Sequence, residues 1–190
     1  MGLPESGARK ALKDLTLEEL WALFPIVLTP HRPEWKRWAE EETAALAELL
    51  SDFSPVITHI GSTAIPGIQA KPIIDILVEI APPVEWARIK DLMERAGYLC
   101  MSSSEGRMSF NKGYTPEGFA ERVFHIHFRV AGDNDEIRFR DYLNHHPAVA
   151  REYEALKLSL LPRYRNDRDG YTEAKSEFVR RIKEQIESDK

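Results

Sequence analysis

The chain has 190 residues, of which 43% are hydrophobic and 30% are charged, a composition typical of a globular protein with a substantial core. Its net charge of −5 excludes a strong general attraction to nucleic acid or to an anionic membrane. One cysteine, Cys100, excludes an internal disulfide and a CxxC metal site. No run of residues approaches the roughly 18 to 20 apolar residues of a membrane span.

The length suits one domain, or one domain with a helical extension. We expect a single domain over residues 1–190, with a sheet core in about 26–130 and a helical part in about 134–187. The first residues lack the apolar segment of a signal peptide, so we expect a cytoplasmic, bacterial protein. The oligomeric state stays open.

The N-terminal half alternates helical and extended patterns. Thr16 and Glu19 form a capping-box pattern at the start of a short helix that ends near Leu23. Further patterns predict a helix over 34–50, a strand over 55–60, a loop or a turn with a short helix over 61–71, a strand over 72–80 and a helix over 82–96.

The C-terminal half begins with short strands and ends in helices. We expect strands near 98–101, 107–112 and 122–130, helices at about 134–144, 147–161 and 171–187, and a polar connector over 162–170. This order predicts an α+β, or mixed α/β, fold with a helical C-terminal part.

Polar side chains alternate with apolar ones along three of the predicted strands. Because side chains of a strand point to opposite faces in turn, each of these strands has one polar or mixed face. If the strands share a sheet, their polar faces can coincide. That surface would carry Asp75, Arg107, Ser109, Asn111, His125, His127 and Arg129. A cluster of this kind is more typical of a cleft floor than of an ordinary solvated face.

His125 and His127 lie two residues apart and therefore point to one side of their strand, with their Cα atoms about 7 Å apart. Three interpretations stay open. The pair can bind a divalent metal ion together with Asp75. It can contact a phosphate or transfer a proton near neutral pH. It can also be an ordinary hydrogen-bonded pair on a sheet surface.

The segment from Gly61 to Lys71 follows a strand directly and contains Gly61, Ser62 and Thr63 in succession. Such a turn leaves backbone N–H groups and hydroxyls free to bind an anion. Lys71 can reach a phosphate as a point charge. Asp75 then follows within an apolar strand, 14 residues after Gly61.

This layout resembles the nucleotidyltransferase superfamily, in which a Gly-Ser turn binds the triphosphate and an Asp-x-Asp on the next strand binds divalent metal. The block HIGSTAIPGIQAKPIID, the later HIHFR and the C-terminal YEALK and YTEAKSEF are similar to the GrpB family. The resemblance spans about residues 26–187. It implies a nucleotidyltransferase-like fold, with a mixed sheet flanked by helices and C-terminal helices packed against the cleft.

The chain departs from the superfamily pattern at Leu77, where a second acid is expected. Leucine cannot bind metal, whereas two-metal phosphoryl transfer needs clustered carboxylates. Glu79 lies on the same face but about 13 Å from Asp75 along the strand. The site is therefore expected to rely on Asp75, His125 and His127 as metal ligands and catalytic groups, with Mg²⁺, Mn²⁺ or Zn²⁺ as the ion.

Gly61, Ser62, Thr63, Lys71, Arg107, Arg129, Lys157 and Lys175 are the candidate phosphate- or nucleotide-binding residues. By the resemblance, the C-terminal helices line the cleft and direct Lys157 and Lys175 at a phosphate. Alternatively, both lysines lie on helix surfaces and cover apolar neighbours with their stems.

Three functions stay open at this point. The protein can be a metal-dependent nucleotidyl- or phosphoryltransferase, an enzyme for another reaction on a nucleotide or phosphorylated metabolite, or a non-catalytic binding module that retains the phosphate pocket. A protein-interaction scaffold is a weaker alternative. A nucleotide or a phosphorylated small molecule is the expected partner, without generic nucleic-acid or membrane binding.

Overall fold

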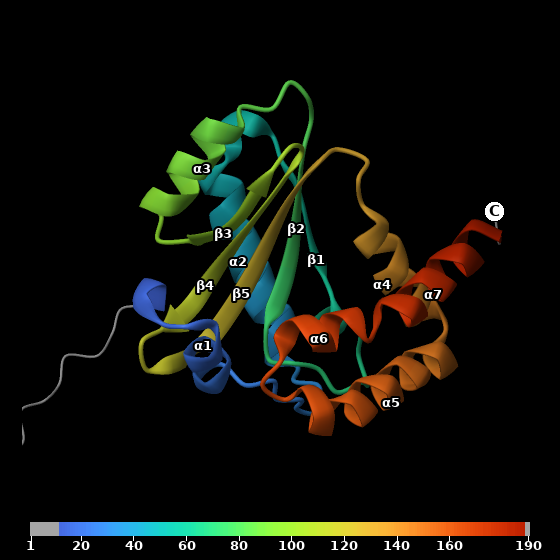
Figure 1. Ribbon diagram of the computed structural model, residues 1–190. Helices are drawn as coiled ribbons and strands as arrows, with labels where there is room; N and C mark the ends of the chain where they lie inside the picture. The colour runs from blue at the N-terminus through green and yellow to red at the C-terminus, as the bar shows by residue number, and fades with distance from the viewer. Residues whose placement is uncertain (1–11, 189–190) are drawn as a thin grey trace, which may run out of the picture.

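The computed structural model describes residues 12–188 and contains a five-stranded mixed sheet flanked by helices (Figure 1). The strands are β1 (Val56–Ile60), β2 (Ile74–Ile80), β3 (Leu99–Ser104), β4 (Arg107–Thr115) and β5 (Gly118–Val130). The α-helices are α1 (Leu17–Leu23), α2 (Glu34–Leu49), α3 (Trp86–Arg95), α4 (Asp135–His145), α5 (Pro147–Tyr164), α6 (Arg168–Glu173) and α7 (Ser176–Ser188). The predicted α+β class is confirmed.

The strands are ordered β1-β2-β5-β4-β3 across the sheet. β2 and β5 are parallel, and the other neighbouring pairs are antiparallel. The parallel pair lies near the middle of the sheet, where both strands are covered on both faces. This arrangement brings residue 75 next to residue 125, although 50 positions separate them in the chain.

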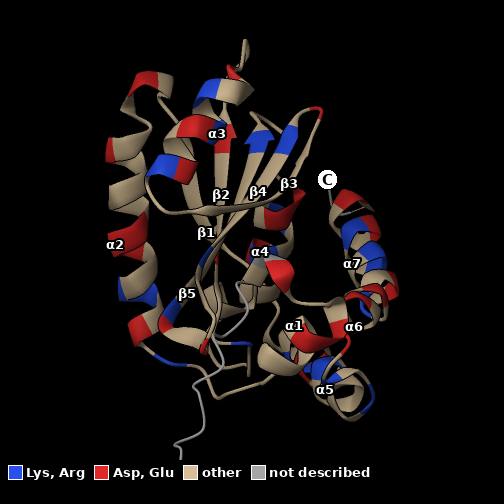
Figure 2. Ribbon diagram, turned by 60° about the vertical axis from the view of Figure 1, so that its left-hand side comes forward, with Lys and Arg blue, Asp and Glu red and all other residues tan. Residues whose placement is uncertain are grey.

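One face of the sheet packs against α2 and α3 and forms the main core. Trp35 and Leu46 of α2 are fully buried against Ile76, Phe110 and Phe128 of the sheet. Phe110 and Phe128 pack edge to face, with ring centroids 5.6 Å apart. Figure 2 shows α2 on one side of the sheet and α4, α5 and α7 on the other.

The opposite side holds a second, smaller core formed by the C-terminal helices and the loop after β1. Ile65 and Ile68 of the loop pack with Leu143, Tyr153 and Ile182 of α4, α5 and α7. This core fixes the C-terminal helices over the sheet face that α2 leaves open. No helix in the described part of the chain is long and apolar enough to cross a membrane.

Several predicted boundaries change. The capping box of α1 is confirmed, because the Glu19 amide donates to Thr16 and the Thr16 amide donates to Glu19. The predicted polar connector over 162–170 is wrong, since α5 continues to Tyr164 with Pro162 in its last turn and α6 begins at Arg168.

The single helix predicted over 171–187 is also wrong. The chain folds there as the end of α6 followed by α7. Asp167 starts α6 early by accepting a hydrogen bond from the Gly170 amide at 2.8 Å. That short-range cap competes with the longer amphipathic pattern and is not visible in the apolar periodicity.

We expect Phe128→Ala to destabilise the fold by about 3–5 kcal/mol, because it removes a fully buried ring and leaves a cavity against Phe110. Urea unfolding followed by circular dichroism measures the change. The matched control is Val56→Ala on β1, whose side chain is 59% exposed and should change stability by no more than about 0.5 kcal/mol. Equal effects of the two substitutions would contradict the position of the core.

Candidate functional site

The sheet register aligns polar side chains from three strands on the face that the C-terminal helices cover. Asp75 of β2 pairs with His125 of β5, which pairs with Asn111 of β4. His127 pairs with Ser109 in the next row. The alternation seen in the sequence therefore places the polar residues of the three strands on one face, as predicted, with Leu77 beside His127 as an apolar member.

Asp75, His125 and His127 converge at the centre of this surface. The Asp75 Oδ1 atom lies 3.2 Å from His127 Nε2 and 3.4 Å from His125 Nδ1. Burial by itself would raise the pKa of the Asp75 carboxyl, but hydrogen bonds and charge from the two histidines hold it well below its usual range. Burial lowers the pKa of His125. These three residues are a group whose ligand atoms all lie within 4.8 Å of one another.

The His125 ring nitrogen that does not face Asp75 bonds to Tyr114, which in turn bonds to Arg168. The Tyr114 hydroxyl lies 2.7 Å from His125 Nε2, and Arg168 donates to the same hydroxyl at 2.9 Å. Because Nε2 is engaged in this way, Nδ1 faces Asp75. A partner on the outer nitrogen is the usual means by which proteins orient a metal-binding histidine.

Gly61 approaches Asp75 more closely than any other residue type could. Its φ is +72°, and a Cβ placed there would lie 2.6 Å from Asp75 Oδ2. The following residues, Ser62–Ala64, form a single 3₁₀ turn rather than a longer helix. The Gly-Ser turn therefore lies directly beside the carboxylate.

A cavity of about 1230 Å³ contains this group and is lined by cationic side chains from the loop before β2 and from the C-terminal helices. They are Lys71, Lys157, Arg168, Lys175 and Lys183, of which Lys183 pairs with Asp135 at 3.1 Å. In the described part of the chain, Lys71, Lys175 and Arg168 form no salt bridge with a carboxylate. Tyr171 lies between two of them, with Lys175 Nζ 4.5 Å and Lys71 Nζ 5.6 Å from its ring centroid.

Burial and mutual repulsion weaken the charge of these lysines. Burial, followed by the charges of Lys175 and Arg168, lowers the pKa of Lys71 to about 7. Burial and the charge of Lys175 lower the pKa of Lys157 to about 8. The Lys157 side chain is only 2% exposed and donates to the Gln69 carbonyl. The charge of Asp75 opposes this decrease in pKa for Lys71 and Lys175, but burial outweighs it, and neither lysine forms a salt bridge with a described carboxylate.

The structure does not bring every candidate residue to this cavity. Arg107 and Arg129 lie farther along the sheet in ion pairs with Asp133 and Glu136. Thr63 is buried and bonds to His59 Nε2 at 2.9 Å. None of these three predicted residues lines the cavity, whereas Gly61, Ser62, Lys71, Lys157 and Lys175 do.

Sequence reasoning missed both Tyr114 and Arg168 as site residues. Tyr114 lies beyond the predicted end of its strand, which ran only to 112, and β4 in fact continues to Thr115. The aromatic residue at the end of an apolar-polar alternation was the available signal. Tyr153 also lines the cavity, where it hydrogen-bonds Ser62, and its pKa is raised to about 12 chiefly by burial.

The second-acid position offers no carboxylate. Leu77 is fully buried in β2. Glu79 is also buried, and it accepts hydrogen bonds from the Gly132 amide at 2.9 Å and from Asn134 at 3.2 Å. Glu79 therefore holds the turn after β5 in place, at a distance from the Asp75 group.

The mixed sheet with a Gly-Ser turn beside an acid on the next strand is a nucleotidyltransferase-like fold. The structure is similar to that of a mutant Cid1 poly(U) polymerase bound to MgATP, with a TM-score of 0.50 and 11% identity, covering 68% of this chain and 42% of that one. At that identity the similarity shows the fold alone.

The chain belongs to the GrpB family, whose model, described as GrpB protein, matches residues 25–185. The glutamate-rich protein GrpB of Alkalihalophilus pseudofirmus is 37% identical over 163 residues, covering 83% of this chain and 93% of the relative. A UPF0157 protein of Pseudomonas aeruginosa is 38% identical over 160 residues, covering 83% of this chain and 66% of the relative. The crystal structure of the conserved protein GrpB from Enterococcus faecalis has a TM-score of 0.71 and 30% identity, covering 84% and 96% of the two chains.

We expect Gly61→Ala to disturb the site as well as the backbone. Gly61 and Gly67 both have positive φ, but a Cβ at Gly67 meets no atom within 4 Å. Both substitutions should cost about 1–3 kcal/mol of stability through backbone strain. Only Gly61→Ala should displace Asp75 and shift the imidazole NMR resonances of His125 and His127. Unchanged resonances in Gly61→Ala would contradict the close approach.

Proposed function

We propose that this protein binds a nucleotide or another phosphorylated small molecule in the cavity, together with one divalent metal ion. The phosphates would lie on Lys71, Lys157, Lys175 and Arg168. The observation that carries the proposal is this group of cations without carboxylate partners beside an Asp-His-His group. An unpaired cationic cavity favours a polyanionic ligand, because the ligand supplies the missing counter-charge.

The Asp-His-His group fits a metal ion in both spacing and chemistry. Ligand atoms about 2.1 Å from a tetrahedral ion lie about 3.4 Å apart, close to the 3.2 and 3.4 Å found around Asp75 Oδ1. Two imidazoles with one carboxylate favour Zn²⁺ or Mn²⁺ over Mg²⁺, which prefers oxygen ligands. Of the three candidate ions, we therefore favour the two that accept nitrogen.

Metal-assisted nucleotidyl or phosphoryl transfer is the reaction class that this arrangement supports. A bound ion would supply Lewis-acid stabilisation of charge on a phosphoryl oxygen. Lys71 and Lys175 would hold the phosphate oxygens, and Ser62 would donate to them from the turn beside Asp75. Tyr114 and Arg168 would keep the His125 ring oriented. MgATP bound to a protein of the same fold supports a nucleotide as the first ligand class to test.

Binding without chemistry is the second candidate, and Leu77 is the observation that favours it. A two-metal transfer site needs clustered carboxylates, and the described residues offer one metal-binding group with a single carboxylate. In this alternative the same cavity holds the same ligand as a sensing or regulatory pocket, and no product forms.

We expect Zn²⁺ or Mn²⁺ and a nucleoside triphosphate each to raise the melting temperature, because a ligand that binds the folded state stabilises it by mass action. Asp75→Asn should weaken metal affinity on the order of 100-fold, since it removes the central ligand. Asp133→Asn is the matched control, an acid that pairs with Arg107 outside the cavity. Titration calorimetry measures both affinities.

Turnover separates the two candidates. Nucleotide consumption followed by chromatography, present in the native chain and abolished by Asp75→Asn, would establish the transfer reaction. If nucleotides and metal ions bind but no nucleotide is consumed, the result supports the non-catalytic binding function. If neither a metal nor a phosphorylated ligand binds, the proposed function is wrong.

The affinity for a polyanion should fall as the pH rises from 6.5 to 8.5. Lys71 titrates at a pKa of about 7 in the free protein, so it is charged at the lower pH and largely neutral at the upper. A bound anion favours the charged amine, so binding in this interval takes up a proton. Calorimetry with triphosphate in two buffers of different ionisation enthalpy measures that uptake. Lys71→Met, compared in the same buffers, should lose part of it, and an unchanged uptake would contradict the assignment.

A further inference from the structure

The cavity extends beyond the cations, and the end away from them is apolar. α1 contributes Leu17, Leu20 and Trp21 to the lining, and β3 contributes Leu99 and Met101. Among the described residues of α1 and β3, no Lys, Arg, Asp or Glu lines the cavity. A phosphate would find neither charge nor hydrogen-bond donors from these side chains, except the Trp21 indole.

A single row of the sheet connects the two ends of the cavity. Asp75, His125, Asn111 and Leu99 lie side by side on β2, β5, β4 and β3. Neighbouring strands are about 4.8 Å apart, so Asp75 and Leu99 lie about 14 Å apart across the sheet. Along this row the surface changes from carboxylate and imidazole to amide and then to alkyl. The change in polarity is continuous within one cavity.

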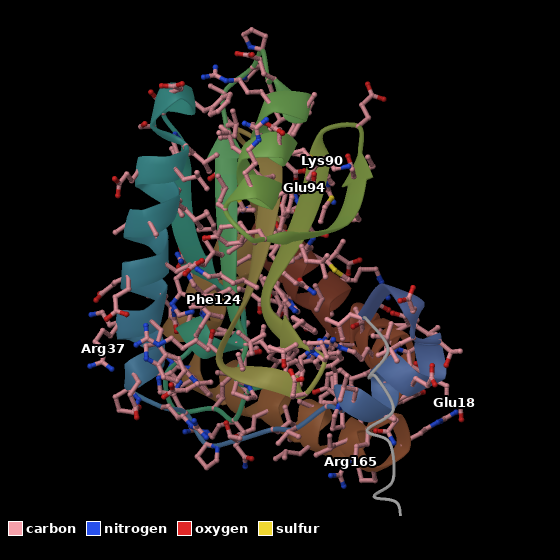
Figure 3. The ribbon with its side chains drawn as sticks, turned by 90° about the vertical axis from the view of Figure 1, so that its left-hand side faces the viewer. Glu18, Arg37, Lys90, Glu94, Phe124 and Arg165 are labelled. Carbon is pink, nitrogen blue, oxygen red and sulfur yellow. The ribbon has the colours of Figure 1, made fainter. Side chains whose placement is uncertain are left out.

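The apolar end is exposed as well as apolar. The side chains of Leu17, Leu99 and Met101 are 57%, 49% and 54% exposed. Large apolar side chains that gather on one surface indicate a binding site, whereas scattered ones do not. Figure 3 shows α1 beside the sheet with Glu18 pointing outward. No residue of α1 is fully buried, and Leu17, Leu20 and Trp21 border the cavity without being covered by the core.

α1 is fixed in this position by contacts at its C-terminal end. The Phe24 ring packs on Tyr114 and Phe119, at centroid distances of 4.8 and 5.0 Å. The Ile26 amide donates to the Arg165 carbonyl at 2.7 Å. The same Tyr114 that orients His125 thus also supports the helix that closes the apolar end.

We propose that the ligand of this cavity is an amphiphilic phosphate ester, with its phosphate on the cations and an alkyl or aryl group on α1 and β3. The inference rests on the proposed function and deepens it by naming the ligand class. Charge complementarity sets the orientation, because none of the cations that line the cavity comes from the described residues of α1 or β3. The volume of about 1230 Å³ exceeds what a phosphate group alone requires.

A series of phosphate esters with one head group tests the proposal. Methyl, butyl and hexyl phosphate differ in chain length alone, and all three are used below the concentration at which hexyl phosphate aggregates. Burial of each added methylene should tighten binding about twofold to fourfold. Titration calorimetry measures the three affinities, and ATP in the same buffer reports on the proposed function separately.

Substitutions at exposed positions show where the longer alkyl chains bind, without destabilising the fold. Leu17→Ser and Met101→Ser should reduce the dependence on chain length and leave methyl phosphate affinity unchanged. Val56→Ser is the matched control, equally exposed at 59% but on β1 outside the lining. Lys175→Met should weaken all three esters by the same factor.

The outcomes are distinguishable. Chain-length dependence that falls in Leu17→Ser and Met101→Ser, but not in Val56→Ser, supports the proposal. Methyl phosphate or ATP binding with no gain from the longer chains overturns it and leaves the proposed function standing. A gain that persists unchanged in both variants also overturns it. Absence of binding by every ester and by ATP overturns this inference and the proposed function together.

Discussion

The parallel pairing of β2 with β5 in one register is the constraint on which the site depends. It places Asp75 beside His125 and brings His127 Nε2 to 3.2 Å from Asp75 Oδ1. A slip of one residue would turn the polar side chains toward the α2 core and the apolar ones toward the cavity. Ile74 and Ile76 of β2 and Phe124, Ile126 and Phe128 of β5, all buried on the core face, oppose that slip. The hydrophobic core therefore sets the geometry of the polar site.

The C-terminal helices give this surface its charge. Lys157, Arg168 and Lys175 come from a part of the chain some 80 to 100 residues after Asp75, and the second core around Ile65 and Tyr153 holds them in place. Gathering cations in a partly buried space opposes their own ionisation, which is why the pKa values of Lys71 and Lys157 fall. A site built in this way stores unfavourable electrostatic energy that a bound anion would relieve. The same feature is the basis of the proposed phosphate binding by a chain that is acidic as a whole.

The remaining acid on the site face of β2 serves the fold. Glu79 accepts hydrogen bonds from Gly132 and Asn134 in the turn between β5 and α4, and it is buried there. Leu77, between Asp75 and Glu79, packs where the superfamily pattern places a carboxylate. The histidines of β5 stand on the neighbouring strand and offer nitrogen in place of oxygen. If the proposed metal ion binds, this exchange of ligand type would be the chemical difference between this site and a two-carboxylate, two-metal site.

The sequence by itself determined most of the strands, their polar faces and the Gly-Ser turn, because alternation and turn chemistry are local properties. It placed Asp75, His125 and His127 on strand faces that can coincide, and the parallel pairing of β2 with β5 brought them together. Lys71 was expected from its place after the Gly-Ser turn, and Lys157 and Lys175 only from the resemblance to related transferases. Tertiary structure decided that Arg107 and Arg129 lie in ion pairs away from the cavity, since all residues on one strand face look alike until the covering helices are placed. It also decided the role of Tyr114 and Arg168, which depends on two elements 54 residues apart. The apolar end between α1 and β3 was equally invisible in the sequence, because its side chains meet only when the sheet and the N-terminal helix are packed together.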